Sequence, residues 1–198
     1  LTAICGYLDL LEKEEQTESG KRYLKIIRER TSAMRSLTQE LFGYSVAASS
    51  EAALETEEVS LNDVLEQSLA AFYGVLSERK IAPKIELAAA PVMRMLNRNA
   101  LRRVFDNILN NAAKYSDGDL EVRLSSTGTV SFSNAAKKLD VVQTERLFDR
   151  FFTVETGGGS TGLGLSIAKL LTEKMGGSIA AEYREGRLIV RLEFNECE

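Results

Sequence analysis

The pattern of apolar residues differs between two parts of this chain, and this difference limits the possible folds more than any other feature. Up to about residue 45 the apolar residues recur every three or four positions, beginning with Leu1, Ile4 and Leu8, which is the period of an amphipathic helix. From residue 60 onward, helical segments are interspersed with short segments in which apolar and polar residues alternate, as in half-buried strands. The sequence therefore predicts a helical unit followed by a unit of helices and strands.

The helical unit is predicted to contain two helices, residues 1–14 and 21–45, separated by a polar stretch. The second helix has apolar residues at heptad-like positions: Leu24, Ile27, Met34 and Leu41. A two-helix hairpin with few aromatic residues buries little apolar surface alone, so we expect it to pair with a second copy as a four-helix bundle. Packing of both helices on the rest of the same chain is the alternative.

The expected domains are a dimerisation hairpin at 1–48, an acidic linker at 49–59 and a second domain at 60–198. In the second domain we predict helices that begin after Ser60 and Asn97, which can cap them, and a last helix from about 164. Strands are predicted at 85–87, 92–96, 120–124, 130–132, 178–183 and 187–194. The predicted fold class is α+β: half of a dimeric four-helix bundle, then an α/β two-layer sandwich with a mixed sheet and helices on one face.

Composition excludes several kinds of chemistry. The 198 residues include no histidine, so this polypeptide alone cannot perform chemistry that needs an imidazole. Cys5 and Cys197 have no metal-binding or disulfide spacing, and a reducing compartment is expected. A net charge of -4 makes nucleic acid an unexpected partner. No apolar run approaches the roughly 20 residues of a membrane span, so no membrane contact is expected for this stretch.

The helix that includes residues 104–116 has one wholly polar face. That face consists, at positions i, i+4, i+7 and i+8, of Asn107, Asn111, Lys114 and Tyr115. Asparagine is a poor helix former, and exposed helix faces more often carry Glu and Lys. The pattern indicates that the amides bind a metal or a phosphate. A solvated face with incidental asparagines is the alternative.

A glycine-rich segment, residues 157–164, runs directly into the predicted helix 165–175. Glycines leave backbone amides accessible, and a helix N-terminus adds partial positive charge, so the two together favour an anion such as phosphate. The segment is not a P-loop, because no lysine follows Gly164, and no strand leads into it as in a dinucleotide fingerprint. A flexible lid or turn is the alternative.

Together these segments resemble the catalytic core of sensor histidine kinases. Residues 107–116 resemble the N box of that family, 147–152 its F box and 161–166 its G2 box, and residues 1–7 resemble the stretch after its phosphoacceptor motif. The resemblance covers nearly the whole chain. It implies the cytoplasmic core of a two-component kinase that binds ATP and Mg²⁺ and transfers the γ-phosphoryl group to a histidine.

The resemblance also implies roles for single residues. Asn111 would coordinate Mg²⁺, and Asn107 would contribute one turn earlier. The other residues expected to bind ATP are Lys114, Tyr115, Asn134, Ala136, Thr161, Gly162, Leu163 and Gly164. Lys114 would contact phosphate oxygens and Tyr115 would lie against the nucleotide. The residues expected to anchor the lid through apolar contacts, from a short helix, are Phe148, Phe151 and Phe152.

The implied partners are a second copy, through the hairpin, and the receiver domain of a response regulator. The phosphoacceptor histidine is expected immediately upstream of Leu1, so the chain is expected to belong to a longer protein and not to autophosphorylate by itself. That longer protein is expected to be an inner-membrane sensor, with the present chain on the cytoplasmic side.

One segment departs from the family. Residues 134–138 stand where family members have Asp-x-Gly-x-Gly. Asn134 keeps an oxygen that can accept a hydrogen bond from the adenine amino group, so we expect weaker but retained adenine recognition. If the family glycines adopt positive φ, Ala136 and Lys138 would be strained there, so the loop is expected to follow another path. The lid is also expected to be short.

Because the family aspartate and glycines are missing from residues 134–138, a second interpretation stays open: a degenerate nucleotide-binding module without kinase activity, which acts through dimerisation and partner binding. A hydrolysing ATPase related to gyrase or heat-shock chaperones is a third reading. It is the least favoured, because Asn107 stands where those enzymes place a water-activating glutamate, and an amide cannot act as a general base.

Overall fold

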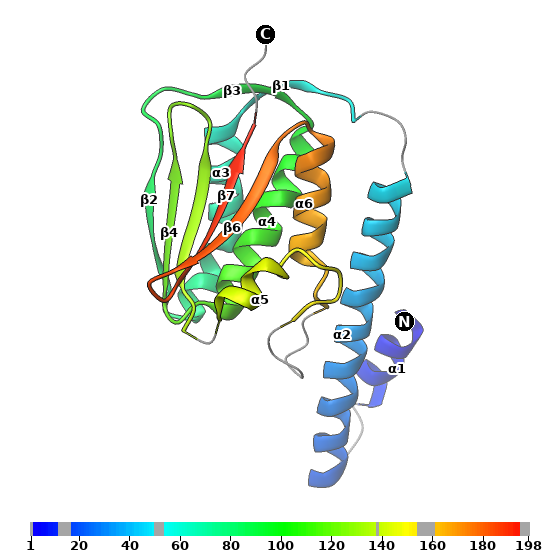
Figure 1. Cartoon of the computed structure of the whole chain (residues 1–198). Coiled ribbons are helices and arrows are strands. Elements are labelled where there is room, and N and C mark those ends of the chain that lie inside the picture. Colours follow the sequence, from blue (N-terminus) through cyan, green and yellow to red (C-terminus); the bar gives the residue numbers. More distant parts are fainter. Residues whose placement is uncertain (1, 12–16, 50–53, 138, 154–160, 195–198) are drawn as a thin grey trace.

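The computed structural model describes residues 2–11, 17–49, 54–137, 139–153 and 161–194 (Figure 1). Helix α1, Thr2–Leu11, packs against the long helix α2, Glu18–Ser49. Leu8 and Leu24 are buried, and Asp9 forms an ion pair with Arg28 at 2.8 Å. The predicted helical hairpin is therefore present, with α2 continuing beyond the expected end near residue 45.

Much of the apolar surface of the hairpin is not covered by this chain. The exposed large apolar residues of α1 and α2 are Ile4, Leu11, Tyr23, Ile26, Ile27, Met34, Leu37, Leu41 and Phe42. They include three of the four predicted heptad-like positions. The alternative in which this face packs on the rest of the chain does not apply to these residues, and pairing with a second copy stays a prediction.

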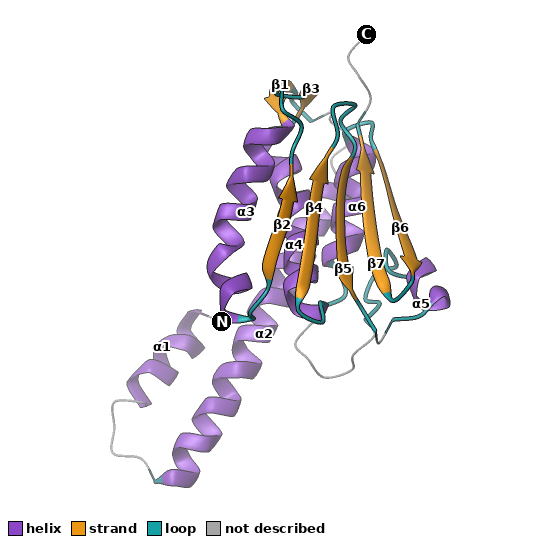
Figure 2. Ribbon diagram, turned by 90° about the vertical axis from the view of Figure 1, so that its left-hand side faces the viewer, coloured by secondary structure: helices purple, strands orange, loops and turns teal. Residues whose placement is uncertain are grey.

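The second unit has a five-stranded sheet with three helices packed on one face (Figure 2). The strands are β2 (Ala82–Glu86), β4 (Asp119–Leu124), β5 (Val130–Ala135), β6 (Ser178–Arg184) and β7 (Arg187–Glu193), and the helices are α3 (Leu61–Glu78), α4 (Arg98–Tyr115) and α6 (Gly164–Lys174). The sheet order is β2-β4-β5-β7-β6, with β2 and β4 parallel and the other neighbours antiparallel. The predicted mixed sheet with helices on one face is confirmed.

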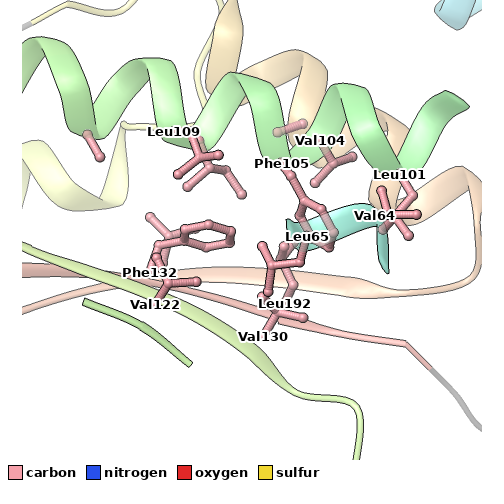
Figure 3. Packing of buried hydrophobic residues seen from close by; sticks show 14 of the residues in the cluster. Val64, Leu65, Leu101, Val104, Phe105, Leu109, Val122, Val130, Phe132 and Leu192 are labelled. Carbon is pink, nitrogen blue, oxygen red and sulfur yellow. The ribbon is translucent and has the colours of Figure 1, made fainter. Parts of the chain in front are cut away.

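The core lies between α4 and the sheet (Figure 3). Phe105 of α4 and Phe132 of β5 are almost completely buried, with ring centroids 6.0 Å apart and planes tilted by 50°. Tilted pairs at this separation suit the charge distribution of aromatic rings. The apolar side of α4 is thereby committed to the sheet, which leaves its polar side for another role.

Local signals set several boundaries as predicted. The side chains of Ser60 and Asn97 accept hydrogen bonds from the backbone of the first turns of α3 and α4. Glu185 and Gly186 both have positive φ in the turn between β6 and β7, as a tight two-residue hairpin turn requires. β2 differs from the prediction, because it begins at Ala82 rather than after Pro83. Pro83 is tolerated inside it because β2 is an edge strand, where a missing amide costs no ladder bond.

Two elements were not predicted. Helix α5, Val141–Glu145, is short, and strand β1, Glu57–Ser60, lies inside the stretch expected to be a linker. β1 pairs with β3, Met93–Leu96, in a separate two-stranded sheet. Its acidic sequence hid it, because Val59 is the only large apolar residue in the strand and is completely buried.

Arg94 joins this small sheet to the main one. Its side chain is 6% exposed, and its guanidinium donates to the carbonyl oxygens of Met93 (2.8 Å), Thr127 (2.7 Å) and Phe194 (3.1 Å). Gly128 leaves the space that the guanidinium needs, since a Cβ there would lie 2.5 Å from Arg94 Nη2.

In the described part of the chain, no helix is both long and apolar enough to cross a membrane.

Candidate functional site

A pocket lies where the polar face of α4, the end of β5 and the start of α6 come together. Its volume is about 200 Å³, against roughly 10–15 Å³ that one water molecule requires by the same measure. A small organic ligand therefore fits it. The predicted residues that line it are Asn107, Asn111, Lys114, Tyr115, Asn134, Ala136, Thr161, Gly162, Gly164 and Phe152.

The polar face of α4 supplies donors and acceptors to this pocket. Asn107 and Asn111 are half-buried, whereas Lys114 is exposed at the rim. The amide nitrogen of Asn107 is buried and has no hydrogen-bond partner among the described residues. Leaving such a donor unpaired costs about 1–3 kcal/mol, so its position indicates a ligand that accepts a hydrogen bond there.

The N-terminus of α6 faces the same end of the pocket. Its N-cap, Leu163, makes no side-chain capping bond, so amide groups of the first turn stay available and carry partial positive charge. Gly164 lies beside Asn107, because a Cβ at Gly164 would be 3.7 Å from Asn107 Oδ1. An anion placed here would meet helix amides on one side and the asparagine on the other.

The backbone conformation and the close packing at position 162 require a glycine. It has a φ of +67°, and a Cβ on it would lie 2.5 Å from the carbonyl carbon of Phe151. Leu163 differs from the other predicted residues of this segment, because its side chain is completely buried and its N–H donates to Thr161 Oγ1 at 3.3 Å. Its expected contact with phosphate stays a prediction. The preceding residues 157–160 lie outside the described part of the chain.

The opposite end of the pocket is formed by β5 and the segment after it. Asn134 is 4% exposed, and its Nδ2 donates to the Ala135 carbonyl at 3.0 Å, which leaves Oδ1 as an acceptor. Ala136 N–H donates to Gly186 O at 2.9 Å, and Lys137 N–H donates to Asp117 Oδ2 at 2.7 Å. These bonds hold the segment in place without glycine.

Ala136 does not adopt the strained backbone conformation, and the expected difference in path from the family loop stays a prediction. Among the described non-glycine residues, positive φ occurs at Lys80, Phe151 and Glu185, so Ala136 is not strained. Lys138, the other residue expected to be affected, lies outside the described residues.

Asp119 supports the end of β5 from beneath. Its carboxylate accepts the Ala135 N–H at 2.6 Å and pairs with Arg187. Burial acts most strongly on Asp119 and raises its pKa, but the hydrogen bond from Ala135 and the Arg187 guanidinium together outweigh burial and hold the pKa below its ordinary value. The carboxylate is therefore ionised and fixes the strand end that presents Asn134.

The three phenylalanines do not lie on a short helix as predicted. Helix α5 ends at Glu145, and the chain continues in turns joined by bonds such as Asp149 N–H to Arg146 O at 2.9 Å. Phe151 has a φ of +63°, which a right-handed helix does not allow. Spacing alone could not distinguish these turns from a helix.

Two of these phenylalanines contact protein groups as an anchor should. Phe152 lines the pocket beneath the Arg146 guanidinium, 4.7 Å from the ring centre. Phe148 packs on the core, with the Lys169 ammonium 5.7 Å from its ring. Phe151 is 59% exposed, which differs from the expected apolar contact. Their anchoring of a lid stays a prediction.

Several lining residues were missed. They are Glu40, Asn110, Ser116, Asp117, Leu139, Leu147, Thr153, Leu165 and Leu188. Asp117 follows the helix that carries the predicted polar face, and no motif singled it out. Glu40 had no local signal at all, since it belongs to α2 and reaches Thr161 from 121 positions away, where the Thr161 hydroxyl donates to its carboxylate.

Residues 96–196, about half of the chain, match the family described as "Histidine kinase-, DNA gyrase B-, and HSP90-like ATPase". The chain belongs to this family. Within it, the curated relatives are sensor histidine kinases, which confirms the resemblance of the sequence to that catalytic core. Sensor histidine kinase YcbM of Bacillus subtilis is 25% identical over 193 residues, and sensor protein VanSC of Enterococcus gallinarum is 31% identical over 199 residues.

The alignments cover 92% of this chain and 62% of YcbM, and 96% of this chain and 55% of VanSC. The chain thus spans somewhat more than half the length of these relatives.

Solved structures share the fold over almost the whole chain. Histidine kinase AdeS of Acinetobacter baumannii has a TM-score of 0.72 at 20% identity, covering 100% of this chain and 95% of AdeS. Full-length ShkA in complex with AMPPNP has a TM-score of 0.73 at 22% identity, covering 97% and 43%. ThkA in complex with the response regulator TrrA has a TM-score of 0.73 at 24% identity, covering 99% and 57%.

Proposed function

We propose that this chain is the catalytic core of a two-component sensor histidine kinase. It binds ATP with Mg²⁺ and, in the longer protein, transfers the γ-phosphoryl group to a histidine for relay to a response regulator. The observation that carries the proposal is the convergence of the α4 amide face and the α6 N-terminus in one pocket, where the buried Asn107 Nδ2 has no hydrogen-bond partner in the described part of the chain.

The α6 end of the pocket suits the phosphates. The amides at Gly162 and Gly164 and the helix N-terminus favour negative charge, and Lys114 adds a positive charge at the rim. Asn111 offers a neutral amide oxygen, a ligand type that Mg²⁺ accepts when phosphates supply the rest of its shell. Bound there, Mg²⁺ would neutralise charge on the phosphates.

The donor set is consistent with a metal held jointly with the nucleotide. Among the described residues, no group of three or more Cys, Asp and Glu side chains is placed to hold a metal ion. A divalent ion at Asn111 would therefore depend on phosphate oxygens for its charge balance.

The β5 end of the pocket suits an adenine ring. Asn134 presents Oδ1 as an acceptor for the amino group, because its Nδ2 is already donating to Ala135 O. Apolar surface nearby comes from Ala136, Leu139 and Leu188. The complex of the similar kinase ShkA with AMPPNP supports the same ligand class.

The proposed function implies two partners for this chain. The exposed apolar residues of α1 and α2 suit a dimer interface, which a second copy of the hairpin would cover. The complex of ThkA with TrrA supports a response-regulator receiver domain as the second partner. From the resemblance to sensor kinases, we propose that the chain lies on the cytoplasmic side of a membrane-anchored sensor.

A non-catalytic nucleotide-binding module is the second candidate. It is favoured by the neutral Asn134 and by Ala136, which stand where the resemblance implies an aspartate and a glycine. Both candidates bind nucleotide, so phosphoryl transfer is the property that separates them.

The proposal is tested by calorimetry of ATP binding with Mg²⁺ and by phosphoryl transfer. Asn111→Ala is expected to weaken ATP binding about tenfold or more, corresponding to about 1.4 kcal/mol. Gln67→Ala, an exposed amide on α3, is the matched control and should bind like the wild type. Absence of ATP binding by the wild type at millimolar nucleotide would reject both candidates.

For transfer, the chain is extended upstream to include the expected histidine and incubated with labelled ATP and Mg²⁺. Acid-labile label on the protein is the expected result. Nucleotide binding without labelling would favour the non-catalytic module.

A further inference from the structure

Helix α2 reaches the nucleotide pocket through one acidic residue. Glu40 is half-buried and lines the pocket, although it belongs to the helical hairpin. Its carboxylate accepts a hydrogen bond from the Thr161 hydroxyl, and the same hydroxyl accepts the Leu163 N–H at 3.3 Å. Glu40 is therefore one side chain away from the backbone at the start of α6.

The next turn of α2 holds the helix in this position. The Arg150 guanidinium lies over the Tyr44 ring, 4.6 Å from its centre. Gly43 leaves room for Arg103 of α4, since a Cβ at Gly43 would overlap the guanidinium. α2 thus lies against Arg103 of α4 and Arg150 of the turns after α5, and it packs against α6 (Figure 1).

The negative charge of Glu40 would act on a triphosphate bound in the pocket. Two described acidic residues line the pocket, and Asp117 is held at the β5 end by the Lys137 N–H. Glu40 is at the other end, beside the glycines proposed to hold phosphates. A carboxylate and a triphosphate repel one another, and the repulsion is stronger in a partly buried site than in water.

We propose that Glu40 is an electrostatic gate on the nucleotide pocket. With α2 docked, the Glu40 carboxylate opposes entry of the triphosphate and occupies the Thr161 hydroxyl. With nucleotide bound, repulsion weakens the Glu40–Thr161 bond and favours release of α2 from the pocket. By linkage the two effects are equal in free energy, so the position of the hairpin and nucleotide occupancy regulate one another. This inference rests on the proposed function.

The test uses Glu40→Gln, which removes the charge and keeps an oxygen that accepts the Thr161 hydrogen bond. Calorimetry compares ATP with adenosine, which has no phosphates, in the wild type and the variant at low salt. Glu40→Gln is expected to bind ATP about fivefold tighter or more and to bind adenosine unchanged. Added salt should narrow the ATP difference, because screening weakens charge repulsion. Glu29→Gln, an exposed residue on α2 with the same charge change, is the control.

The outcomes of this calorimetry distinguish failure of the gate from failure of the proposed function. Weaker ATP binding by Glu40→Gln, or equal affinities, overturns the gate and leaves the proposed function standing. A gain of the same size for adenosine overturns it too, because the effect would not depend on phosphate charge. If neither the wild type nor Glu40→Gln binds ATP, the proposed function fails and the gate fails with it.

Discussion

Restoring the family aspartate at position 134 should destabilise this protein. In the structure Asn134 Nδ2 donates to the Ala135 carbonyl at 3.0 Å, and the side chain is 4% exposed. Asn134→Asp places an oxygen where the nitrogen stands, so two acceptors face each other. Rotating the carboxylate does not help, because both of its outer atoms are oxygens.

The size of the effect follows from two losses. The hydrogen bond contributes about 1 kcal/mol, and the buried carboxylate oxygen that is left without a donor costs about 1–3 kcal/mol. The Ala135 carbonyl keeps its bond from the Asp117 N–H at 3.0 Å. The expected loss is therefore about 2–4 kcal/mol, or a fall in Tm of about 6–12 °C at roughly 3 °C per kcal/mol for a chain of this size.

The effect should also depend on pH in a defined direction. The introduced carboxyl, buried beside a carbonyl, has a pKa in the folded state above its unfolded value of about 3.9. Such a group destabilises the fold as pH rises above the unfolded pKa, because ionisation is easier in the unfolded chain. Below about pH 4 the protonated acid can donate to Ala135 O, and the penalty should be small.

The assay is thermal and urea unfolding of the wild type and variants at pH 4 and pH 8. Asn134→Ala loses the hydrogen bond without adding an acceptor, so it should lose stability at both pH values equally. Asn110→Asp is an isosteric change at an exposed position and should change stability by less than about 0.5 kcal/mol. An Asn134→Asp variant as stable as the wild type at pH 8 would refute the reasoning.

Three further predictions concern other positions. Gly162→Ala forces a Cβ against the Phe151 backbone at positive φ, so calorimetry should show ATP affinity reduced about tenfold or more, whereas Gly74→Ala, with open space around it, should bind normally. Asp119→Asn should cost about 1 kcal/mol at pH 7. Because the folded-state pKa of Asp119 is lowered, its contribution is present above the unfolded pKa of about 3.9 and lost as pH falls through the folded-state pKa, so acid unfolding curves of the two proteins should converge. Arg94→Met removes three hydrogen bonds of about 1 kcal/mol each, and urea unfolding should show a loss of about 3 kcal/mol.

Local patterns were sufficient for most of the fold. The caps at Ser60 and Asn97 and the turn at Gly186 depend on residues within one turn of each other, so they can be read from short segments. The two faces of α4 also follow from the helical period alone. Strand β1 was missed because one buried valine in an acidic stretch produces no alternating pattern.

The sequence predicts those pocket residues that belong to short motifs. Asn107, Asn111 and the segment 161–164 were found because helical spacing and glycine spacing are local properties. The spacing of Phe148 and Phe152 predicts a helix where the structure has turns, because the same spacing suits both. The backbone bonds that keep Ala136 unstrained could not be foreseen, because their acceptor, Gly186, belongs to a distant hairpin.

The sequence by itself determined the mixed α+β character, the polar face of α4 and the glycine-rich start of α6, because each follows from the period or conformational range of neighbouring residues. Only the tertiary structure decided that these segments share one pocket, how Asn134 is oriented, and that Glu40 of the hairpin enters the site. Those facts depend on packing between segments far apart in the chain, and no local spacing encodes the distance between them.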